Sequence, residues 1–79
     1  MIEELRNLIP DLLSQAAEFG VCNAEVKNGK RSGISIEFHK DWGWSANAFS
    51  EKGDTRTSHH KSPDQALDEV EALLPEMNQ

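Results

Sequence analysis

The sequence predicts an α+β fold, a two-layer sandwich in which an N-terminal and a C-terminal helix pack on one face of an antiparallel three- or four-stranded meander. The period of the apolar residues predicts it: steps of three and four near both ends of the chain indicate helices, and alternation in between indicates strands with one buried face. A chain of 79 residues with 37% apolar residues supports one small core, so residues 1–79 are predicted to form a single domain.

The first helix is predicted over residues 2–19. Gly20 follows it as a C-terminal cap, because a residue without a Cβ accepts the left-handed conformation. Pro10 lacks the N–H that would bond to Arg6, so the helix either kinks there or begins its regular part near it. The apolar positions share one face: Ile2, Leu5, Ile9, Leu12, Leu13, Ala16 and Phe19.

The second helix is predicted over residues 63–74. Ser62 is a favourable N-cap and Pro63 a favourable first residue. Pro75 is predicted to end the helix, because the residue before a proline avoids helical angles. The apolar stripe consists of Ala66, Leu67, Val70, Leu73 and Leu74.

Three strands are predicted between the helices. Their inward side chains are Cys22, Ala24 and Val26, then Ile34, Ile36 and Phe38, then Trp44, Ala46 and Ala48. Residues 55–60 are either a short fourth strand or an irregular lead into the second helix. The outer face is expected to stay in water and to present Asn23, Glu25, Lys27, Arg31, Ser35, Glu37, His39, Ser45, Asn47 and Phe49.

Three-residue hairpin loops keep the apolar side chains on one face. A loop over residues 27–29 pairs Val26 with Lys30 and Cys22 with Ile34, whereas a two-residue Asn28-Gly29 turn would split the core. The same loop is predicted at two further places: residues 41–43, pairing Phe38 with Ala46 and Ile36 with Ala48, and residues 51–53.

The net charge of −6 is unevenly distributed. Residues 1–20 hold four acidic residues and one basic residue, and residues 63–79 hold five acidic residues and no Lys or Arg. Residues 21–62 hold seven basic and five acidic residues. Two acidic helices side by side on the sheet would therefore form an anionic flank, opposite a nearly neutral sheet face.

The sequence does not predict catalytic chemistry, a metal or a cofactor. It contains no phosphate-binding loop, dinucleotide fingerprint, zinc-protease helix or nucleophile elbow. His59 and His60 would need a further ligand such as His39 or Asp41, so solvated histidines are the favoured interpretation. Cys22 is the only cysteine, which excludes an internal disulfide and favours a small apolar residue on a strand.

The two tryptophans differ. Trp44 is predicted to be a core or rim residue, because it alternates with Ala46 on the inward side. Trp42 is at a loop tip, where it either contacts a partner or folds back over the end of a helix to close the core.

No segment approaches the roughly 20 apolar residues that cross a bilayer, and the first residues are acidic where a secretory signal is basic. The chain is therefore expected to be cytosolic and not to bind membranes.

The order helix, three strands, helix resembles double-stranded RNA-binding domains over about residues 5–74. The resemblance is one of topology. Those domains carry a lysine cluster at the start of the second helix, where this chain has Lys61-Ser62-Pro63-Asp64 and then acidic residues. Duplex RNA binding in that manner is therefore not expected.

The favoured hypothesis is a non-enzymatic interaction module, such as a phage-type inhibitor of host defence that covers a basic, nucleic-acid-binding surface of a larger protein. Its predicted partner-binding residues are Trp42, Asp64, Asp68, Glu69, Glu71, Glu3 and Glu4. The alternative is weak nucleic-acid binding by the outer sheet face through Lys27, Arg31 and His39. Homodimerisation through an uncovered sheet edge is a third hypothesis.

Overall fold

The structure is a computed structural model that describes residues 2–77. Its elements are α1 (Ile2–Asn7), α2 (Ile9–Phe19), β1 (Val21–Lys27), β2 (Gly33–His39), β3 (Gly43–Ser50), β4 (Gly53–Arg56) and α3 (Pro63–Met77). The four strands form one antiparallel sheet in the order β1-β2-β3-β4. The predicted α+β class is confirmed, and the arrangement is compatible with the topology noted above, with one additional strand.

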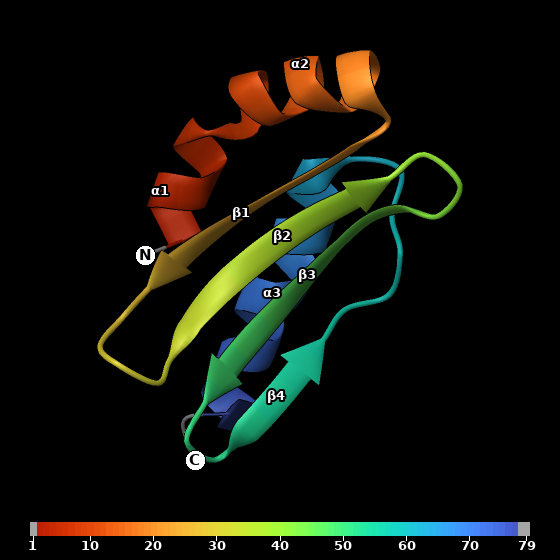
Figure 1. Ribbon diagram of the computed structural model, residues 1–79. Coiled ribbons are helices and arrows are strands. Elements are labelled where there is room, and N and C mark those ends of the chain that lie inside the picture. The colour runs from red at the N-terminus through yellow and green to blue at the C-terminus, as the bar shows by residue number, and fades with distance from the viewer. Residues whose placement is uncertain (1, 78–79) are drawn as a thin grey trace.

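The helices cover one face of the sheet (Figure 1). The C-terminal helix α3 packs on β3, β4 and β2, whereas α1 and α2 pack along β1, and α1 also contacts α3. The inward side chains of the sheet and those of the helices form a single cluster, in which Leu5 and Leu12 meet Leu67 and Val70. The predicted inward faces of the three long strands are thus confirmed.

The N-terminal helix breaks at Leu8, two residues before Pro10. Leu8 has φ −86° and ψ −7°, and Pro10 occupies the first turn of α2, where a missing N–H leaves no bond unmade. The carbonyl of Leu8 accepts a hydrogen bond from Leu12 N at 2.9 Å. Gly20 then ends α2 with φ +75° and donates its N–H to Ala16 O, as the sequence predicted.

The strand register differs from the prediction at the first hairpin. Cys22 lies opposite Phe38 and Val26 lies opposite Ile34, so the loop covers residues 28–32 instead of 27–29. Gly29 has the predicted positive φ. The longer loop moves the register by four residues, and an even shift leaves every side chain on its predicted face.

The other two hairpins also differ in register. In the second hairpin, Phe38 lies opposite Trp44 and Ile36 lies opposite Ala46. The prediction had paired Phe38 with Ala46 and Ile36 with Ala48. Ala48 lies opposite Ile34. The turn therefore covers residues 40–42, and Trp42 N donates to His39 O at 3.0 Å. In the third hairpin Gly53 pairs with Ser50, so only residues 51–52 form the turn.

The fourth strand, Gly53–Arg56, is shorter than the predicted segment 55–60 and begins two residues before it. After Arg56 the chain leaves the ladder, and His60 returns to it through a bridge to Trp44. Thr57 hydrogen-bonds this irregular stretch to β3. Its N–H donates to Ala46 O, and its hydroxyl accepts the N–H of Ala46 at 2.9 Å, where a regular strand would offer a carbonyl.

Replacing Thr57 with valine is expected to destabilise the fold by about 1–3 kcal/mol, because the buried N–H of Ala46 would lose its acceptor. Thr57→Ser keeps the hydroxyl and serves as the control. Urea unfolding followed by tryptophan fluorescence measures both. An unchanged stability of Thr57→Val would contradict this account, because valine keeps the methyl group and removes only the hydroxyl.

The C-terminal helix is longer than predicted. Ser62 Oγ accepts the N–H of Gln65 at 3.3 Å, which confirms the N-cap. The helix does not end before Pro75 but continues to Met77. A proline near the end of a helix removes a single N–H bond to the carbonyl four residues earlier, and the bias against helical angles at the preceding residue is a preference that packing can override.

Cys22 is buried, as predicted for a small apolar residue, and its thiol donates to Leu12 O at 3.4 Å. Burial raises the pKa of the Cys22 thiol, because the thiolate would lose hydration. In the part of the chain that the structure describes, no helix is long and apolar enough to cross a membrane.

Candidate functional site

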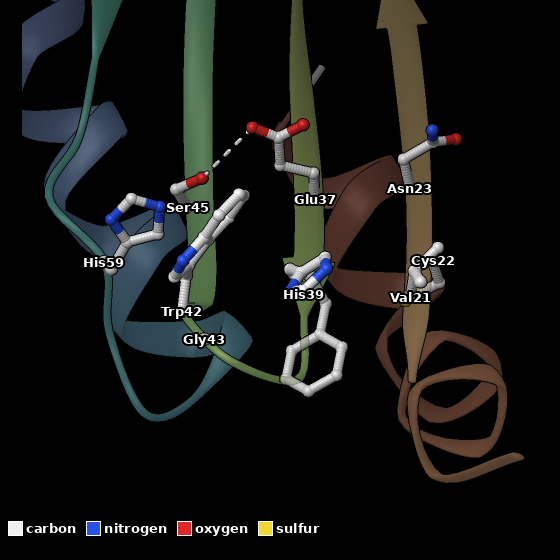
Figure 2. A pocket seen from close by; sticks show the side chains of 10 residues that line it. Val21, Cys22, Asn23, Glu37, His39, Trp42, Gly43, Ser45 and His59 are labelled. Carbon is white, nitrogen blue, oxygen red and sulfur yellow. Dashed lines mark hydrogen bonds between the residues drawn. The ribbon is translucent and has the colours of Figure 1, made fainter. Parts of the chain in front are cut away.

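Trp42 lies on the outer face of the sheet between two histidines (Figure 2). Its ring stacks on His39, with a centroid distance of 4.5 Å and an interplanar angle of 26°, and it faces His59 at 6.3 Å. The Trp42 residue remains 66% exposed. Of the two interpretations of this residue, the structure favours the exposed one, because the ring covers the outer face instead of a helix end.

A pocket of about 220 Å³ opens beside this cluster. It lies over the ends of β1, β2 and β3 that are nearest the 40–42 turn, and its polar and aromatic lining includes Asn23, Glu37, His39, Trp42, Ser45 and His59. Pockets for small molecules usually measure about 300–1,000 Å³. This pocket is smaller, and its volume suits one inserted side chain better than a cofactor.

Ser45, which lines the pocket with Trp42, is buried on the outer face of the sheet. The prediction left it in water on the outer face, but the residue is only 1% exposed. Its hydroxyl donates to Glu37 Oε1 at 3.4 Å, and the same carboxylate oxygen lies 2.6 Å from Arg56 Nη1. The Glu37–Arg56 ion pair is solvent-exposed, where such pairs contribute about 0–1 kcal/mol, but it neutralises the charge at the pocket.

The position of His59 depends on a close contact between two backbone segments. Gly43 has φ +94°, and a Cβ built on it would lie 2.5 Å from the carbonyl oxygen of His60. The bridge between Trp44 and His60, with N···O distances of 2.8 and 2.7 Å, holds the segments together. Glycine at position 43 therefore allows the 57–60 segment to approach β3 and brings His59 to Trp42.

His60 points the other way, toward α3. Its Nε2 lies 2.6 Å from Glu69 Oε1, and the same oxygen accepts the N–H of Ser58 at 3.2 Å. The two adjacent histidines thus face opposite sides, as expected for an extended backbone. Glu69, one of the predicted partner-binding residues, anchors the segment that carries His59.

The acidic residues of α1 and α3 lie in the other layer of the molecule. We define the acidic flank as Glu3, Glu4, Asp64, Asp68 and Glu71. Arg6 of α1 bridges to α3, with N···O distances of 3.1 Å to Asp64 and 2.7 Å to Asp68. Its hydrogen bond to Asp68 raises the pKa of the Arg6 guanidinium, against the opposing effect of burial. The helices are therefore side by side as predicted, but one cation offsets part of their charge.

The predicted partner-binding residues therefore do not form one surface. Trp42 belongs to the outer sheet face, the acidic flank belongs to the helical layer, and Glu69 is engaged with His60. No local pattern indicates that His59 is a neighbour of Trp42, because the contact depends on the bridge between Trp44 and His60.

The residues of the nucleic-acid alternative are also separated. Lys27 lies opposite Gly33 at one end of β2, and His39 lies at the other end. Six residues of strand separate these positions by about 20 Å. Arg31 is in the loop beyond Lys27. The three side chains therefore do not converge on one phosphate-binding site.

Among the side chains that the structure describes, those of residues 2–74, no three from His, Cys, Asp or Glu are grouped so that they could hold a metal ion. Comparisons with models of protein families, with curated proteins and with solved structures found no match to this chain.

Proposed function

We propose that this chain is a non-enzymatic protein-binding module that docks on its partner through Trp42 and the pocket beside it. The observation that carries the proposal is an indole that is 66% exposed yet stacked on His39 at the rim of a pocket. Tryptophan is enriched among the residues that dominate binding energy at interfaces. Stacking on His39 orders the ring before binding, which lowers the entropy cost of association.

The pocket gives this surface a second contact. In the proposed complex, Trp42 lies against the partner while one partner side chain enters the pocket between Glu37 and His59. A central aromatic residue beside a small pocket, surrounded by polar side chains, is the usual composition of an interface hot spot.

The net charge of −6 favours a partner with a basic surface. The acidic flank lies in the helical layer, so its contribution is to accelerate the encounter over a distance, whereas the Trp42 surface sets the lifetime of the complex. The narrower hypothesis of a phage-type inhibitor that covers a nucleic-acid-binding surface stays a prediction.

Trp42→Ala is expected to weaken the complex at least about 30-fold, corresponding to a hot-spot contribution of about 2 kcal/mol. The partner is captured with the wild-type chain from cells of the source organism, purified, and titrated against both proteins by calorimetry. The melting temperature of Trp42→Ala is expected to change little, because the ring is mostly solvent-exposed.

Phe19→Ala is the matched control, since Phe19 is an aromatic residue of nearly equal exposure, 65%, at the end of α2. It should leave the affinity unchanged. Equal affinities of wild type and Trp42→Ala would contradict the proposal. So would tight binding of a single-stranded oligonucleotide at low salt that Trp42→Ala abolishes, because the stacked ring would then serve nucleic acid.

A further inference from the structure

The sheet has two edges, and they differ in length. The edge strand β4 has four residues, whereas β1 has seven. The pairing of β1 with β2 is continuous from Val21 to Lys27, without a bulge. The strand contains no proline, so two of the common devices that protect a sheet edge, a bulge and a proline, are missing.

The hydrogen bonds at the ends of the β1–β2 ladder show which backbone groups face outward. Lys40 N donates to Gly20 O at 2.9 Å, and Asn28 N donates to Ser32 O at 2.8 Å. Hydrogen-bonded pairs alternate along an antiparallel ladder, so the even-numbered residues of β1 bond to β2. The N–H and C=O groups at the free edge therefore belong to the odd-numbered residues: Val21, Asn23, Glu25 and Lys27.

Apolar side chains gather around this edge. Ala24 and Val26 point toward the core but are only half-buried. Val21, at the start of the strand, is 53% exposed. An added strand would cover part of these apolar side chains.

A second copy of the chain would bring its own α1 and α2 to this edge. Both α1 and α2 pack along β1 (Figure 1), and the backbone carbonyl of Leu12 in α2 contacts the thiol of Cys22. Symmetric pairing of two β1 strands would place them about 4.8 Å apart, whereas the helices above them need an axial separation of about 8–10 Å. A strand without a helix over it avoids this crowding.

We propose that the free edge of β1 receives an extended segment of the partner protein, which pairs with the backbone of Val21–Lys27 as a fifth strand. This inference rests on the proposed protein-binding function and names how part of the partner is held. The segment alternates apolar residues, which lie beside Ala24 and Val26, with polar residues on the outer face, and a basic residue lies beside Glu25, away from the Lys27 end of the strand.

The test uses the full chain and a capped seven-residue peptide of alternating valine and lysine. Amide hydrogen exchange followed by NMR should show slow exchange at Cys22, Ala24 and Val26 in the free protein and fast exchange at Asn23 and Glu25. Saturating peptide should slow exchange at Asn23 and Glu25 at least tenfold. The same peptide, N-methylated at alternate residues on its pairing side, has equal charge but lacks those donors and should not bind.

Glu25→Pro and Glu25→Ala form a matched pair, because both remove the carboxylate but only proline removes the outward N–H. The proline variant should lose peptide binding, and the alanine variant should keep it, with the amide spectra of β3 and α3 unchanged in both. If Glu25→Pro fails to fold, the N-methylated peptide answers the same question on the wild-type chain.

The edge proposal would be overturned if the peptide did not bind at millimolar concentration, or if the N-methylated peptide bound equally well. Equal peptide binding by the two Glu25 variants, both folded, would also overturn it. So would a dimer in light scattering whose Asn23 and Glu25 amides are protected. If the peptide changed the NMR spectrum only around Trp42, the edge proposal would be overturned, but the proposed function would not be contradicted. If neither Trp42→Ala nor Glu25→Pro weakens binding of the natural partner, both the edge proposal and the proposed function are contradicted.

Discussion

Gly43→Ala is expected to lower the free energy of unfolding by about 2–5 kcal/mol. A side chain at φ +94° costs about 1–2 kcal/mol. The new Cβ would also lie 2.5 Å from the carbonyl oxygen of His60, and forcing atoms into a packed site costs about 1–3 kcal/mol more. Urea unfolding, followed by the fluorescence of the buried Trp44, measures the loss.

Gly29→Ala separates the two contributions. Gly29 has nearly the same backbone angle, φ +90°, but no atom lies within 4 Å of the position that its Cβ would take. This variant should lose only the conformational part, about 1–2 kcal/mol. If Gly29→Ala and Gly43→Ala were equally destabilised, the close approach of His60 would contribute nothing, and our account of the site would be wrong.

The Gly43 contact also links stability to the docking surface. The backbone of His60 must move away from an alanine at position 43, and His59 moves with it. Trp42 would then lose one of its two aromatic neighbours. Under conditions where Gly43→Ala is folded, we therefore expect weaker partner binding as well, whereas Gly29→Ala should bind normally.

Leu67→Ala is expected to destabilise the protein by about 2–5 kcal/mol. Leu67 of α3 is 0% exposed and belongs to the cluster that joins α3 to the sheet and to α1. A domain of this length has a total stability of about 4–12 kcal/mol, so this single truncation removes a large fraction of it. Thermal and urea unfolding measure the change.

Leu13→Ala is the matched control, because Leu13 also lies within a helix but is 48% exposed. Its effect should stay within about 0.5 kcal/mol. A loss at Leu13 comparable to that at Leu67 would mean that α2 buries Leu13 against something other than the described core, such as a second chain, and light scattering would then identify the assembly.

The helices and the faces of the strands could be predicted because each depends on a local period. An apolar residue at every second position assigns one side of a strand to the core whatever its neighbour is, and this assignment was correct for β1, β2 and β3. The buried Trp44 followed from the same alternation. The N-cap at Ser62 and the left-handed Gly20 followed from the chemistry of single residues.

Register could not be predicted in this way. Moving a strand by two or four residues keeps every side chain on the same face, so the apolar pattern does not distinguish Ile34 from Phe38 as the partner of Cys22. The loop length decides between them, and the five-residue loop over 28–32 carries no local signal that excludes three residues.

The amino-acid sequence by itself determined the fold class, the sidedness of the sheet and the acidic character of both helices, because these depend on periods and charges along the chain. Only the tertiary structure decided that Trp42 stacks on His39, that Ser45 is buried and that Arg6 bridges the helices. The first depends on where the 40–42 turn begins and ends, the second on what covers the outer face of the sheet, and the third on the packing of α1 beside α3, and none of these is encoded in the apolar pattern.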